Sequence, residues 1–191
     1  MNYLGHIYFS NDDFELAKAN LYGDYVKGSD LSNYSELIQK GIRLHREIDN
    51  YIDHNPLITE ELLPILRPDL PKVAPIAVDL IFDHLLAKNW SDFHEKKLNS
   101  YLDEFYDSIR TNELEFSMTF LQQLGRMENF KWMNVYAQFE GLEKLSNGVS
   151  RKLNFSNSLP NTPEVFLKNE KEITRIFYDF MKGAQNHFFH K

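Results

Sequence analysis

The sequence predicts an all-α fold, in which a single domain (residues 1–191) forms a helical bundle of about six to eight helices. Apolar residues recur at spacings of three and four along most of the chain, as they do in amphipathic helices. The composition, with 42% hydrophobic and 14% aromatic residues, is that of a globular protein with a well-filled core. No β-hairpin signal, internal repeat or low-complexity tract interrupts this pattern.

The first half of the chain contains four predicted helices, separated by turn and proline signals. They cover residues 3–9, 14–21, 35–54 and 72–90, and residues 3–9 could alternatively form a short buried strand. The third ends before Pro56, because the residue that precedes a proline is disfavoured in helical conformation. Four prolines between residues 55 and 71 indicate a connector with at most one short helix, whose apolar residues still need burial.

The second half predicts four further helices. Ser91 and Asp92 are expected to cap the first, and two more follow near residues 114–124 and 130–145. Ser146-Asn147-Gly148 is typical of a helix end. Thr162 and Pro163 are expected to open one last helix, since proline is favoured at the first helical position.

Charge and composition exclude several classes of protein. The net charge of −7 argues against nucleic acid as the main partner, because phosphate backbones attract basic surfaces. No apolar run reaches the ~18 residues that a membrane-spanning helix needs, so we expect no membrane association, and the first residues make a poor signal peptide. The absence of cysteine excludes disulfides and thiolate chemistry and is compatible with a cytoplasmic location.

The helix expected at residues 35–54 places ionisable side chains beside its apolar stripe. His45, Asp49 and Asp53 are each four residues apart, so they stand one above another on the helix. Such groups lose hydration next to a core and need a partner, which a divalent cation can supply. The alternative is an ordinary polar flank exposed to solvent.

The helix expected at residues 72–90 has a similar arrangement, in which Asp79 and Asp83 are four apart and His84 follows. Two helices of this kind can close one metal site between them, as in other helical bundles. His84 could instead be a core histidine, and the two aspartates a solvated face. Asp24, next to Gly23, and His6, within an apolar run, are the other candidates.

Imidazole and carboxylate ligands without thiolate suit Mn, Fe, Mg or Zn at a hydrolytic centre. The sequence contains no phosphate-binding loop, nucleophile elbow or dinucleotide-binding fingerprint.

Several motifs, in order, resemble those of the bacterial acyl carrier protein phosphodiesterases. Four lie in the first half of the chain, and Gly148-Val-Ser-Arg151 is a weaker fifth. The four are Met1-Asn-Tyr-Leu-Gly-His6, Asn20 to Gly28, Gly41 to Asp53, and Val73 to Asp79 with Asp83, His84, Leu86 and Trp90.

The resemblance implies an all-α, Mn-dependent hydrolase, divergent from the His-Asp metal phosphohydrolases, with Mg or Fe as alternative ions. The expected reaction removes 4′-phosphopantetheine from the serine of holo acyl carrier protein, an acidic partner. This sequence lacks an adjacent His-Asp pair and instead has the reversed pairs Asp53-His54 and Asp83-His84. The expected roles are catalysis by His6 and Asp79, metal binding by Asp24, His45, Asp49, Asp83 and His84, and substrate binding by Lys27, Arg46 and Arg151.

Two other functions fit the same residues. The chain could be a phosphohydrolase that acts on a small phosphorylated metabolite through the same metal site, or a non-catalytic helical interaction protein with structural His and Asp rows. Bound metal in the purified protein would distinguish the non-catalytic interaction protein from the phosphodiesterase and the phosphohydrolase. A di-iron carboxylate protein is less favoured, because the expected Glu-x-x-His pairs are missing.

Overall fold

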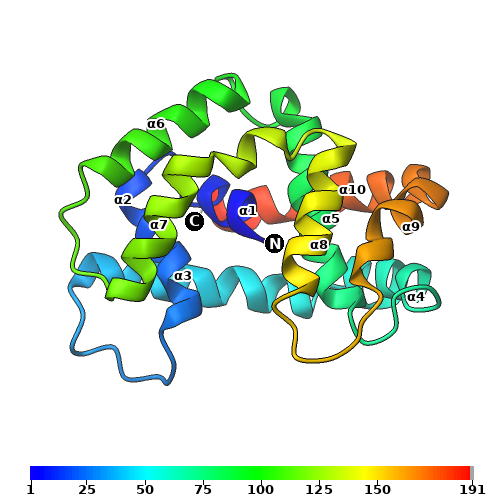
Figure 1. Cartoon of the computed structure of the whole chain (residues 1–191), viewed down its shortest axis with the longest axis horizontal. Coiled ribbons are helices and arrows are strands. Elements are labelled where there is room, and N and C mark those ends of the chain that lie inside the picture. The colour runs from blue at the N-terminus through cyan, green and yellow to red at the C-terminus, as the bar shows by residue number, and fades with distance from the viewer. Residues whose placement is uncertain (190–191) are drawn as a thin grey trace.

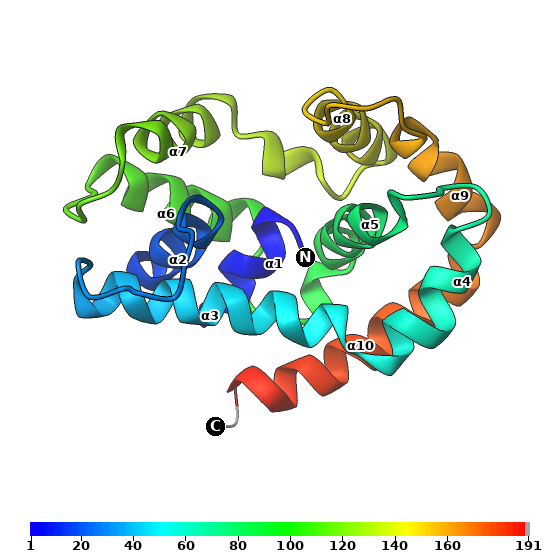
Figure 2. The same ribbon diagram turned by 90° about the horizontal axis from the view of Figure 1, so that it is seen from below.

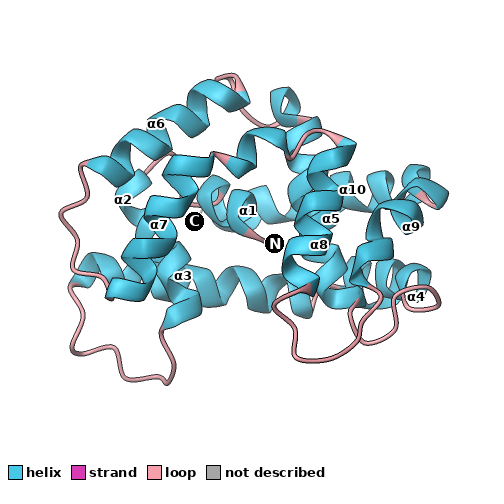
Figure 3. Ribbon diagram, viewed as in Figure 1, coloured by secondary structure: helices cyan, strands magenta, loops and turns pink. Residues whose placement is uncertain are grey.

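The computed structural model describes residues 1–189, and every regular element in that part of the chain is helical (Figures 1 and 3). The all-α class is thus confirmed. The ten α-helices are Tyr3–Tyr8 (α1), Phe14–Leu21 (α2), Glu36–Asp53 (α3), Leu63–Leu66 (α4), Ala74–Lys88 (α5), Leu98–Arg110 (α6), Met118–Phe130 (α7), Phe139–Ser150 (α8), Thr162–Lys168 (α9) and Glu170–Phe189 (α10). The short 3-10 or π-helical turns are Tyr22–Tyr25 (η1), Leu57–Leu62 (η2), Trp90–Asp92 (η3), Trp132–Val135 (η4) and Leu159–Asn161 (η5).

Ten helices in the described residues exceed the six to eight that the sequence predicts, because two regions divide differently. The proline-rich connector contains a π-helical turn that continues into α4. The expected last helix is two helices, α9 and α10, separated at Asn169. Breaks of a single residue leave the apolar periodicity almost unchanged, so the sequence pattern does not reveal them.

Several expected boundaries in the second half are wrong. The helices expected near residues 114–124 and 130–145 are Met118–Phe130 and Phe139–Ser150. Ser91 and Asp92 lie in η3 and do not cap α6, which begins at Leu98. Gly148 does not end α8, which continues to Ser150. A Cβ built on Gly148 would meet nothing within 4 Å, so this glycine lies at an open position of a continuing helix.

The helix α3 organises the part of the fold that carries the ionisable residues. Ser35 caps it by accepting a hydrogen bond from the Ile38 N–H, and it ends at Asp53, one residue before the predicted end. Helix α2 packs along α3 so closely that a Cβ on Gly41 would come within 2.4 Å of the Ala19 backbone. The short α1 lies between α2 and α5, near the middle of the molecule (Figure 2).

Helix α5 is almost entirely buried and forms the centre of the core. Helices α1, α8, α9 and α10 pack around it, while α6 and α7 pack together at the other end of the molecule (Figure 1). Phe82 of α5 contacts Phe177 and Phe180 of α10, which supports the predicted aromatic core. Among residues 1–189, no helix is both long enough and apolar enough to cross a membrane.

Candidate metal centre

A cavity of about 320 Å³ opens where α1, η1, α3 and α5 meet. Its wall combines apolar residues, such as Leu21 and Leu80, with imidazole and carboxylate groups. The histidines and aspartates that line it are His6, Asp24, His45, Asp49, Asp53 and Asp79.

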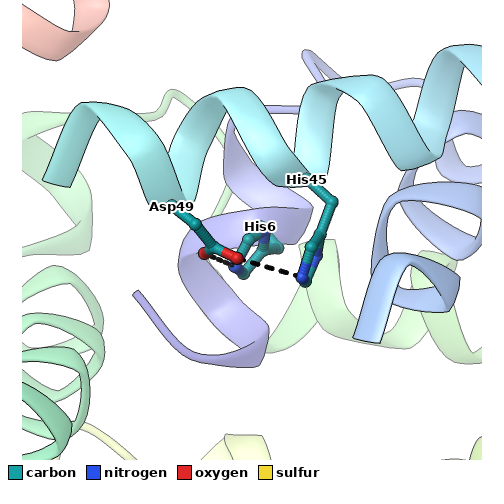
Figure 4. Close-up of side chains that lie close together, drawn as sticks. All are labelled: His6, His45 and Asp49. Atoms are coloured by element: carbon teal, nitrogen blue, oxygen red, sulfur yellow. Dashed lines mark ion pairs between the residues drawn. The ribbon is translucent and has the colours of Figure 1, made fainter. Parts of the chain in front are cut away.

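Three of these side chains form a compact cluster, drawn in Figure 4. One ligand atom of each of His6, His45 and Asp49 lies within 4.8 Å of the others. His45 and Asp49 project from successive turns of α3, and their Nε2 and Oδ2 atoms are 3.2 Å apart. His6 comes from α1, where its Nε2 is 3.3 Å from Asp49 Oδ1 and its ring stacks on that of His45. Asp24, which is more exposed, places Oδ1 3.3 Å from His45 Nε2.

The tautomer of His6 is fixed by Asn20, which is fully buried on α2. The Asn20 Nδ2 group donates hydrogen bonds to the His6 carbonyl and to Ser10 Oγ, at 2.9 and 3.1 Å. Its Oδ1 is therefore the atom that faces His6 Nδ1, at 2.9 Å, and Nδ1 must carry the proton. In neutral His6 the Nε2 lone pair then points at Oδ1 of the Asp49 carboxylate.

Two electron-rich atoms face each other in this arrangement and need a positive charge between them. Burial lowers the pKa of His6, so a second proton on this ring is disfavoured. Burial opposes ionisation of Asp49, but the two imidazoles hold the pKa of its carboxyl well below the usual range. A neutral imidazole opposite a carboxylate is a donor set that fits a divalent cation.

His45 fits closely against the backbone of η1. A Cβ on Gly23 would lie 2.3 Å from Cγ of its ring, so only glycine leaves room for the imidazole. Burial opposes the charged form, but hydrogen bonds with Asp24 and Asp49 raise the pKa of His45 to about 9. Without a cation, a proton on His45 therefore bridges the two carboxylates.

Comparison with known proteins identifies the family. The sequence model of the family described as acyl carrier protein phosphodiesterase matches residues 1–184. The chain belongs to this family. Its enzyme class, a hydrolase acting on a phosphodiester bond, is thus the one that the sequence resemblance implies.

Curated relatives carry the same family name. The acyl carrier protein phosphodiesterase of Salmonella paratyphi A is 25% identical over 153 residues, which are 80% of this chain and 79% of the relative. Those of Salmonella newport and Salmonella enteritidis PT4 are 24% identical over the same shares. No solved structure matches the chain.

The sequence of this acyl carrier protein phosphodiesterase family member predicts seven catalytic or metal-binding residues. Five of them line the cavity: His6, Asp24, His45, Asp49 and Asp79. Asp83 and His84 do not line it. The Asp83 carboxylate is fully buried and accepts hydrogen bonds from the Leu4 and Gly5 N–H groups, at 2.9 and 3.0 Å. These are free donors of the first turn of α1, so Asp83 acts as its N-cap from a distant helix. Burial raises the pKa of Asp83 to about 7.

His84 lies elsewhere on α5. Its Nδ1 is 2.7 Å from the Tyr136 carbonyl, and its ring meets Phe166 edge-on. This is the core histidine that the sequence leaves open as an alternative. Burial lowers the pKa of His84, which is consistent with a neutral ring in an apolar setting.

Two further carboxylates face the same cavity. Asp79 Oδ1 is 2.8 Å from the α-amino group of Met1. Asp53 has a raised pKa, caused first by burial and then by the charges of Asp79 and Asp49. In the sequence, the spacing of four from His45 to Asp49 to Asp53 indicates that Asp53 belongs near this site. No such spacing indicates Asn20.

The three residues expected to bind substrate differ in their surroundings. Arg46 donates hydrogen bonds from Nη2 to the carbonyls of Val26 and Gly28, at 3.1 and 2.7 Å, so its guanidinium holds the loop after η1. Lys27 in that loop and Arg151 after α8 are exposed. The two exposed cations remain available to an anionic partner.

Proposed function

We propose that this protein is a metal-dependent phosphodiesterase that releases 4′-phosphopantetheine from holo acyl carrier protein. His6, His45 and Asp49 would hold the divalent cation, with Asp24 as a fourth ligand. The observation that carries the proposal is the His6 Nε2 lone pair, which Asn20 directs at the Asp49 carboxylate within 3.3 Å. The family name supports the substrate, and a metal remains part of the proposal.

When bound, the cation lowers the pKa of a water molecule and neutralises charge on the phosphoryl oxygens, and Mn, Mg or Fe suits the donor set. The chain itself orients the ligands: Asn20 fixes the His6 ring, and Gly23 leaves space for His45. Asp79, held by the Met1 amine, lines the same cavity and would accept the proton of the attacking water. In this proposal His6 is a ligand, and Asp79 keeps its expected catalytic role.

The test is incubation of the purified protein with holo acyl carrier protein and Mn, followed by mass spectrometry of the carrier. The expected result is that the carrier loses the mass of 4′-phosphopantetheine less one water, because hydrolysis restores the serine hydroxyl; the loss stops on chelation and returns when Mn is restored. His45→Ala and Asp49→Ala should abolish the reaction, because each removes a proposed ligand. A carrier of unchanged mass, with hydrolysis of small phosphoesters instead, would assign the protein to the metabolite phosphohydrolases.

A further inference from the structure

A second cavity, also about 320 Å³, adjoins the proposed metal centre. It is enclosed by α7, η4 and α8, and it shares Asn2, Tyr3 and Val149 with the first cavity. No ligand of the proposed cation lines it. Its volume is at the lower end of that of small-molecule sites.

The two cavities differ in chemistry. The first is lined by four aspartates, whereas no acidic residue of the described chain lines the second, which combines the apolar side chains of Trp132, Val135, Leu145 and Val149 with hydroxyl, amide and basic groups. One of these groups is the Tyr3 hydroxyl, which accepts a hydrogen bond from Gln123 Nε2 at 3.1 Å. The charged residues among those that line the second cavity are all basic: Arg126, Lys144 and Lys152, each exposed.

We infer that the second cavity binds the pantetheine arm of the substrate while the phosphodiester lies at the metal centre. This inference rests on the proposed function. The substrate joins a charged phosphodiester to an uncharged, largely aliphatic chain with amide groups, so its two parts need different surroundings. An acidic cavity that would hold the cation, beside a second cavity with apolar surface, provides both.

The polar groups match this occupant. Asn2, Tyr3 and Gln123 stand at the junction of the two cavities or beside it, where they can hydrogen-bond the amides of the arm. Trp132 and Leu145 offer apolar surface further from the metal centre. The exposed lysines and arginine form a positive rim on a chain of net charge −7, which favours an anionic substrate at this entrance. Binding of the arm, remote from the reacting bond, would contribute to turnover.

Gly148 allows the cavity to be filled without disturbing the fold. It lines the second cavity from α8, and a Cβ built on it would meet nothing within 4 Å. Gly125 of α7 is a matched control: it is also helical and also has open space at Cβ, but it lines neither of the two cavities. Gly148→Leu and Gly125→Leu should fold equally well, because both replace a helical glycine at an open position.

Two measurements test the inference. The first is kcat/KM with Mn and holo acyl carrier protein, which Gly148→Leu should lower at least about tenfold while Gly125→Leu leaves it unchanged. The second is tryptophan fluorescence on titration with free 4′-phosphopantetheine. Trp132 lines the cavity whereas Trp90 is buried elsewhere, so wild type and Gly125→Leu should respond and Gly148→Leu should not. Inorganic phosphate, which lacks the arm, should give no response in any of the three.

Equal turnover and equal fluorescence responses in the two glycine variants would overturn the inference and leave the proposed function intact. A wild-type response to inorganic phosphate as large as that to 4′-phosphopantetheine would also overturn it, because the arm would then contribute nothing. If the wild type with Mn fails to change the mass of the carrier, the proposed function itself is wrong. The mass of the carrier after the wild-type reaction therefore distinguishes failure of this inference from failure of the proposed function.

Discussion

Asn20 determines which atom His6 offers to a cation, although it lies outside the cavity. Replacing it with alanine removes the acceptor for Nδ1–H, so the ring can adopt the other tautomer or rotate. We expect Asn20→Ala to weaken Mn binding by about 10- to 100-fold, the usual effect of losing such an outer partner.

The matched variant is Asn20→Asp, which keeps an acceptor for His6 Nδ1 and should retain more of the affinity than alanine does. Isothermal titration of the metal-free protein with Mn measures both. Equal Mn affinity in wild type and Asn20→Ala would show that the amide does not position His6.

The charge of His45 makes metal binding depend on pH. Its pKa is raised to about 9, so at neutral pH the metal-free ring is an imidazolium and must lose its proton before it binds a cation. The affinity for Mn should therefore rise with pH, by up to about tenfold per unit below pH 9.

Titrations in buffers of different ionisation enthalpy measure the proton released. We expect close to one proton per Mn at neutral pH, and fewer in a His45→Gln variant. An affinity that is flat between about pH 6 and 8 would contradict this assignment of the proton.

At the scale of single residues, sequence predicts the part of the centre that depends on helical spacing. His45 and Asp49 are four apart on a long helix, and the structure brings their side chains together. Asp83 has the same spacing from Asp79, but its carboxylate meets backbone N–H groups of α1. Spacing along one helix cannot reveal which segment packs against it, and so cannot separate a ligand from a remote helix cap.

At the scale of elements, Asp83 joins α5 to the first turn of α1. Asp83→Ala would leave two buried N–H donors without a partner, and we expect it to lower the free energy of unfolding by about 2–4 kcal/mol. Chemical denaturation measures this loss.

Asp107→Ala, at an exposed position of α6, serves as the comparison and should cost far less. An Asp83→Ala protein as stable as wild type, yet unable to bind Mn, would instead return Asp83 to the metal ligands that the sequence predicts.

The sequence predicts the bounds of a helix correctly where an N-cap residue and a proline mark its two ends. The predicted 35–54 helix is α3 to within a residue or so at each end, because Ser35 and Pro56 bound it. The break at Asn169 was not predictable, since apolar periodicity continues on both sides. Propensity alone also places the end of α8 wrongly at Gly148, because the helix continues to Ser150.

At the scale of the whole molecule, the distribution of charge matters more than its sum. The chain carries −7, yet in the proposed function it must bind a carrier protein that the family resemblance implies is acidic. Lys27 and Arg151 are exposed, and each follows a segment that lines the metal cavity. We expect Lys27→Glu and Arg151→Glu to raise KM for the carrier several-fold and to flatten its salt dependence, because such charges act mainly on association.

Lys171→Glu, an exposed change of the same kind on α10, should leave KM unaltered. Kinetics at several salt concentrations compare the three variants. An unchanged KM and salt slope for both Lys27→Glu and Arg151→Glu would mean that the carrier docks on another surface.

The hydrogen bonds between α1 and Asp83 span 78 and 79 positions of sequence. A contact of that range requires closure of the long intervening segment, which costs conformational entropy. His45 and Asp49 lie on one helix, whereas His6 comes from α1, which is held by Asn20 of α2 and by Asp83 of α5. A partly folded chain therefore has an incomplete set of ligands, and the proposed cation would be captured only by finished molecules. Metal binding would then occur only in fully folded molecules, and an incompletely folded chain could not carry out the proposed removal of the prosthetic group.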